Sequence, residues 1–97
     1  MTPSDSIQDY DLKIGRLTRL ATDELRSAHG DGDAMRTACC RYFRRGYVEK
    51  FTTGELVDFF GVSGTVCRDA GFTDQEADEV MRLIGALTDE EIASTQI

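Results

Sequence analysis

Residues 4–29 read SDSIQDYDLKIGRLTRLATDELRSAH, and the spacing of their apolar side chains decides the fold class. Apolar residues recur at alternating steps of three and four, at Ile7, Tyr10, Ile14, Leu17, Ala21 and Ala28, and Leu20 and Leu25 widen the stripe. This period is typical of one face of an α-helix and not of a strand. The sequence therefore predicts a long N-terminal helix, capped by Ser4 or Ser6 and ended by the glycine-rich loop HGDGD.

A second helix is predicted over residues 34–47, AMRTACCRYFRRGY, with Asp33 as its N-cap. At about 100° per residue, an aromatic and apolar face separates from an arginine face. The apolar face holds Met35, Cys39, Tyr42, Phe43 and Gly46, and the other face holds Arg41, Arg44 and Arg45. Gly46 is expected near the end of this helix.

Three capping boxes punctuate the C-terminal half: TTGE at 52–55, TDQE at 73–76 and TDEE at 88–91. Glycines then stand where short helices are expected to stop, at Gly61, Gly71 and Gly85. The expected elements are short helices at about 53–60, 64–70 and 74–84 and a frayed turn at about 89–94. The predicted fold is all-α: a compact single-domain bundle of about five helices, with flexible ends at about 1–4 and 93–97.

Composition agrees with one globular domain, because the chain has 97 residues and 40% of them are hydrophobic. No apolar run approaches the roughly 18 residues that span a bilayer. The start, MTPSDSIQDYD, lacks the basic and then apolar order of a secretory signal, so we expect a cytoplasmic protein without membrane contact. Cys39, Cys40 and Cys67 are expected to be reduced residues of the core.

No pattern of catalytic or ligand-binding residues is found along the chain. His29 has no serine or cysteine in a recognisable nucleophile motif. The loop HGDGDA lacks the third acidic ligand, the sixth-position glycine and the closing glutamate of a calcium loop. We therefore expect no enzymatic activity, no cofactor and no metal.

Charge is distributed unevenly along the sequence. Residues 1–51 contain nine Lys or Arg against eight Asp or Glu, whereas residues 52–97 contain two against ten, so the acidity of the chain lies in its C-terminal half. Two candidate binding surfaces follow. The acidic one is formed by Asp69, Asp74, Glu76, Asp78, Glu79, Asp89 and Glu90, and the basic-aromatic one by Arg41, Arg44, Arg45, Tyr47 and Lys50.

The first functional hypothesis is a small protein-binding module, a regulator, adaptor or inhibitor whose acidic surface meets a basic partner. A nucleic-acid-binding protein is one such partner. The acidity could also serve solubility alone. Self-association into a homodimer stays open.

The alternative is a DNA-binding regulator, because ELVDFFGVSGTVCRD, residues 55–69, resembles a degenerate helix-turn-helix. Leu56, Phe60 and Gly61 suit the first helix and the turn, but only Gly64 separates the serine from the threonine-valine pair. The acidic half would repel DNA phosphates, so nucleic acid is the disfavoured partner.

Overall fold

The computed structural model describes residues 3–61 and 65–96, and over these residues it contains helices and no strand. The helices are α1 Pro3–Ser27, α2 Gly32–Val48, α3 Thr53–Gly61, α4 Thr65–Asp69, α5 Asp74–Ala86 and α6 Asp89–Ser94. The prediction of an all-α fold is confirmed. The expected frayed turn is the sixth helix, and of the ends expected to be flexible, residues 1–2 and 97 lie outside the described part of the chain.

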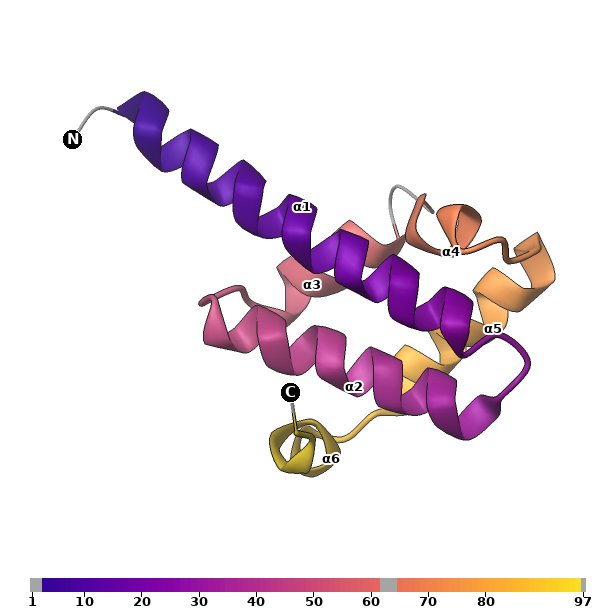
Figure 1. Ribbon diagram of the computed structural model, residues 1–97. Helices are drawn as coiled ribbons and strands as arrows, with labels where there is room; N and C mark the ends of the chain where they lie inside the picture. The colour runs from indigo at the N-terminus through magenta and orange to yellow at the C-terminus, as the bar shows by residue number, and fades with distance from the viewer. Residues whose placement is uncertain (1–2, 62–64, 97) are drawn as a thin grey trace.

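The helices pack around an antiparallel pair formed by α1 and α2 (Figure 1). The short helix α3 passes behind α1 and α4 packs beside it, α5 packs on α2 and α4, and α6 packs on α2. The N-terminal end of α1 extends beyond the rest of the molecule. The core between these layers is built from every described helix, and its largest fully buried side chains include Tyr42, Phe60, Leu25 and Leu56.

Two of the three predicted capping boxes form in full. Thr73 accepts from the Glu76 N–H while Glu76 accepts from the Thr73 N–H, and Thr52 and Glu55 exchange the same two bonds. At the third, Thr88 accepts from the Glu91 N–H at 3.1 Å. These bonds satisfy backbone donors that the first turn of a helix leaves free, which is why each short helix begins where the threonine stands.

Two predicted N-caps are wrong. The helix α1 begins at Pro3, so Ser4 and Ser6 lie inside it. The cap of α2 is Asp31 and not Asp33, because the Asp31 carboxylate accepts from the Ala34 N–H at 3.1 Å. The loop glycine Gly32 becomes the first helical residue, and Asp33 instead places negative charge in the first turn, where the helix dipole favours it.

The close approach of α2 and α3 depends on Gly46, which lies near the end of α2, as predicted, in its last turn. A Cβ at this position would stand 2.3 Å from Cδ2 of Leu56, whose side chain is fully buried. The same contact allows the Tyr42 hydroxyl to donate to the Leu56 carbonyl at 2.5 Å. The sequence placed Gly46 on the apolar face of the helix, and the structure shows why it must be small.

We expect Gly46→Ala to destabilise the fold by about 1–3 kcal/mol, because the added methyl must displace Leu56 from a closed core. The matched control is Gly85→Ala in α5, where an added Cβ meets nothing within 4 Å. That change should stabilise by up to about 1 kcal/mol through helix propensity. Urea unfolding followed by circular dichroism measures both, and equal effects of the two substitutions would contradict the packing argument.

Candidate functional site

Six of the seven predicted acidic residues are exposed, and none of the six makes an ion pair with a described residue. We call these six the acidic surface: Asp69 on α4, Asp74, Asp78 and Glu79 on α5, and Asp89 and Glu90 on α6. Within the described chain, the cations of this half are Arg68 and Arg82, both exposed and also without an ion pair. The acidic surface therefore retains its negative charge.

The seventh residue, Glu76, serves the fold. Its carboxylate completes the capping box of α5 and contacts Nε2 of His29, whose ring stacks on Phe72 with centroids 4.5 Å apart. The backbone hydrogen bond from Thr73 and then the contact with His29 lower the pKa of Glu76. His29, the single histidine of the chain, thus joins the loop after α1 to the start of α5.

A second carboxylate of the acidic half is neutralised by an arginine of α2. Nε and Nη2 of Arg36 donate to the two oxygens of Glu91 at 2.6 and 2.5 Å, in the paired geometry that favours arginine over lysine. The bonds from Arg36 lower the pKa of Glu91. This contact fastens α6 to α2.

The predicted basic-aromatic surface is divided between two sides of α2. Arg45 pairs with Glu24 of α1, and Nη1 of Arg41 lies 3.8 Å from the other oxygen of Glu24. Arg44 and Tyr47 turn toward α6, where they line a cavity of about 360 Å³ together with Asp89 and Ile92. The arginines that share one face in the sequence therefore act in two places. Arg41 and Arg45 contact Glu24 of α1, and Arg44 lines the cavity beside α6.

Lys50 lies in a helix-terminating turn. Its φ is 72°, and the N–H of Phe51 donates to the Gly46 carbonyl at 3.0 Å. This is the left-handed position that glycine usually occupies, as Gly71 does after α4. The lysine is exposed and makes no ion pair with a described residue. Tyr47 is half-buried, and its hydroxyl is bonded to that of Thr53 at 2.7 Å.

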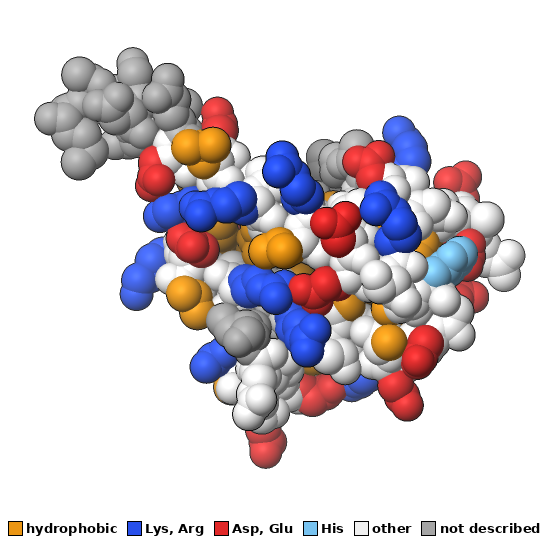
Figure 2. All heavy atoms as spheres, in the orientation of Figure 1, with side chains coloured by type: hydrophobic (Ala, Val, Ile, Leu, Met, Phe, Trp, Pro, Cys, Tyr) orange, Lys and Arg blue, Asp and Glu red, His pale blue; other side chains and the backbone are white. Residues whose placement is uncertain are grey.

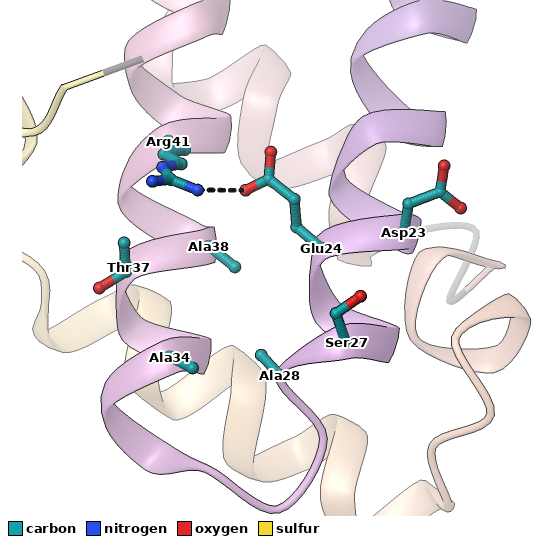
Figure 3. Close-up of a pocket in the computed structure, with 8 residues that line it drawn as sticks. All are labelled: Asp23, Glu24, Ser27, Ala28, Ala34, Thr37, Ala38 and Arg41. Atoms are coloured by element: carbon teal, nitrogen blue, oxygen red, sulfur yellow. Dashed lines mark ion pairs between the residues drawn. The ribbon is translucent and has the colours of Figure 1, made fainter.

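A cavity of about 420 Å³ lies between α1 and α2 (Figure 3). Alanines and short hydroxyl side chains form most of its wall, and the pair between Glu24 and Arg41 crosses one end. One oxygen of Glu24 is buried without a hydrogen bond. The charged residues of the lining are Asp23, Glu24 and Arg41, and the hydroxyl groups come from Ser27 and Thr37.

The segment that resembles a helix-turn-helix is described on both sides of its turn, while residues 62–64 of the turn lie outside the described part. The second helix, α4, has five residues, of which Val66 and Cys67 are buried. The exposed side chains at its end are Arg68 and Asp69, and the Asp69 carbonyl accepts from Arg26 of α1 at 2.8 Å. This helix has one arginine to offer to base edges.

Sequence reasoning missed Glu24 and three exposed apolar residues. Glu24 lies on the flank of the α1 stripe, and the pattern contains no sign that two arginines converge on it. Leu12, Leu20 and Val48 are 65%, 44% and 59% exposed. Leu20 is one of the two residues that widen the apolar stripe of α1 in the sequence, and the structure leaves it at the surface.

Comparison with family models finds no matching family, and comparison with curated proteins and with solved structures finds no match. Over residues 3–61 and 65–96, no helix is long and apolar enough to cross a membrane. In the same residues, no three His, Cys, Asp or Glu side chains gather as a metal site would require. The functional argument therefore starts from the two charged surfaces.

We expect Glu91→Gln to lower the thermal midpoint near neutral pH and to have less effect in acid. The folded-state pKa of Glu91 is lowered, so its contribution is fully present above the unfolded value of about 4.3 and is lost as pH falls through the folded value. Melting followed by circular dichroism at about pH 7 and about pH 3 tests this. Glu90→Gln, which removes an exposed carboxylate without an ion pair, is the control. A Glu91→Gln effect that is constant across this pH range would contradict the assignment.

Proposed function

We propose that this protein is a small protein-binding module whose acidic surface docks on a basic surface of another protein. The observation that carries the proposal is the set of six exposed carboxylates of α4, α5 and α6 that no described cation neutralises. A field of one sign steers association with a partner of the opposite sign and disfavours other partners. Regulation or inhibition of the partner follows where its basic surface is its own binding site for nucleic acid.

Internal pairing supports this choice of surface. The carboxylates that contact a Lys, Arg or His side chain across the fold are Glu24, Glu49, Glu76 and Glu91, and each joins two separate segments of the chain. The carboxylates of the acidic surface hold nothing together, since Asp74, Asp78 and Glu79 lie on the exposed side of α5 while Val80 and Ile84 face the core. Exposed carboxylates that serve no internal contact are available for a partner.

The reading as a DNA-binding regulator has weaker support. Its second helix presents Arg68 beside Asp69, and α5, which packs on α4, adds the exposed Asp74, Asp78 and Glu79. Nonspecific DNA affinity requires cations that replace counterions on phosphates. A duplex approaching α4 would meet the acidic surface instead.

A partner recovered by affinity capture from the host should bind the purified protein with an affinity that falls as salt rises. The triple variant Asp74→Asn, Asp78→Asn and Glu79→Gln should weaken that binding roughly ten-fold or more at low salt. Isothermal titration calorimetry over a salt series measures both effects. Glu76 is left intact because it caps α5.

The matched control is Asp33→Asn with Asp58→Asn, two exposed carboxylates outside the acidic surface. It should bind as the wild type does. Equal loss in both variants would show that net charge alone matters and would remove the assigned surface. Sequence-selective binding of a DNA duplex, measured in the same salt series, would replace the proposal with the helix-turn-helix function.

A further inference from the structure

The large hydrophobic side chains that are exposed in the described chain all belong to α1 and α2. They are Tyr10, Leu12 and Leu20 of α1 and Val48 at the end of α2. Figure 2 shows hydrophobic side chains there, set between Lys and Arg side chains over α1 and α2. The acidic surface has no comparable apolar side chain. The part of the surface formed by α1 and α2 thus differs in composition from the acidic surface.

Leu20 and Val48 form the sides of a shallow groove between α1 and α2. The groove has a volume of about 240 Å³, and Leu17 contributes to its apolar floor. Lys13, Arg16 and Arg45 line it as well. Arg45 and Lys13 are engaged with carboxylates of the same chain, whereas Arg16 and the exposed Arg19 beside it make no ion pair with a described residue. The groove can therefore take an apolar segment that carries negative charge.

The protein itself presents a segment of this kind. Residues 9–12 make a full turn of α1 and are all exposed, and α1 extends beyond the other helices on the N-terminal side of this turn (Figure 1). The Tyr10 hydroxyl donates to Glu55 of α3 at 3.0 Å. Within this turn Tyr10 touches the body, through its ring contacts with Phe51 and Phe59. Asp9, which pairs with Lys13 of the same chain at 3.3 Å, and Asp11 give the turn two carboxylates, and no Lys or Arg precedes Lys13 in the sequence.

We propose that two copies of this chain form a dimer through antiparallel α1 helices, each placing its projecting half along the α1–α2 groove of the other. Such an interface is isologous: the acidic half of one helix meets the basic half of its mate, and the reverse contact forms at the same time. An isolated helix end of this length is marginal in water, so a second copy packed along it would also stabilise the helix there.

The charge order along α1 fixes the direction of the pair. In an antiparallel two-fold arrangement, a residue before the axis faces a residue equally far after it. With the axis near Leu12 and Lys13, Asp9 faces Arg16 of the second copy, and the two copies of Leu12 meet at the centre. A parallel pair would instead place Asp9 beside Asp9 and Arg16 beside Arg16, which is repulsive.

The contact involves one helix half and one groove from each copy, so its area falls at the low end for specific interfaces and the dimer should be reversible. Sedimentation equilibrium from about 1 µM to about 1 mM should show a monomer–dimer equilibrium. Arg16→Glu with Arg19→Glu should shift the midpoint to at least roughly ten-fold higher concentration, and Asp9→Lys with Asp11→Lys should do the same.

Mixing these two charge-reversed proteins is the decisive experiment. Each should be monomeric alone at concentrations where the wild type is dimeric, yet together they should form a heterodimer. In the heterodimer, the unchanged aspartates of one copy face the unchanged arginines of the other, and the introduced lysines face the introduced glutamates. Asp74→Lys with Asp78→Lys on α5 is the control and should dimerise as the wild type does. Circular dichroism checks that each variant is folded.

A wild-type protein that stays monomeric over the whole range would overturn the proposal. So would a dimer that the α1 reversals do not weaken, or reversed proteins that fail to associate when mixed. These outcomes are separate from those for the acidic surface, because the α5 control alters the proposed partner site and leaves the α1–α2 groove unchanged.

Discussion

The close fit of Leu56 against the backbone of Gly46 is the contact on which the arrangement of the helices depends. The Leu56 side chain of α3 packs directly on the backbone of α2, because Gly46 has no side chain there. The Tyr42 hydroxyl then donates a hydrogen bond to the Leu56 carbonyl within the core. The ring of Tyr42 lies 4.9 Å from that of Phe60 on the next turn of α3. A buried hydroxyl needs a hydrogen-bond partner, so the position of α3 satisfies Tyr42 as well as filling space. The burial of Tyr42 also raises the pKa of its hydroxyl, which therefore stays protonated and donates.

The same packing decides which charges remain at the surface. Because α2 lies between α1 and α6, its arginines reach carboxylates on both sides: Arg45 reaches Glu24, and Arg36 reaches Glu91. Both pairs join separate helices and are less exposed than the carboxylates of the acidic surface. Partly buried pairs are screened less by salt than exposed ones. The charge left over is thus negative on α5 and α6, while Arg16 and Arg19 remain on the outer side of α1.

Local sequence rules predicted the elements of the fold well. The helix starts at Thr52, Thr73 and Thr88 followed from capping boxes, whose bonds involve residues three apart and need no tertiary partner. Prediction failed where several residues offered the same local chemistry. Asp31 and Asp33 can both cap a helix, and the choice depended on how the loop after α1 closes. Ser4 and Ser6 offered caps that α1 passes over.

The candidate surfaces were harder to predict, because their residues are defined by contacts between distant segments. The sequence pattern places Arg41, Arg44 and Arg45 on one face of the helix. In the structure Arg45 pairs with Glu24, 21 residues away, whereas Arg44 lines the cavity beside α6. The sequence does not distinguish Glu76 from its acidic neighbours, whereas in the structure its carboxylate contacts His29, 47 residues away.

The acidic residues without such partners were identified correctly as exposed, since nothing in the fold competes for them. Even the thinnest dimension of the molecule is 20 Å, and the Debye length is about 8 Å at physiological ionic strength. Exposed charges farther apart than this length are largely screened from each other, although the two sets meet at α4, where Asp69 lines the same cavity as Arg19 of α1. The net charge of −7 therefore describes neither surface.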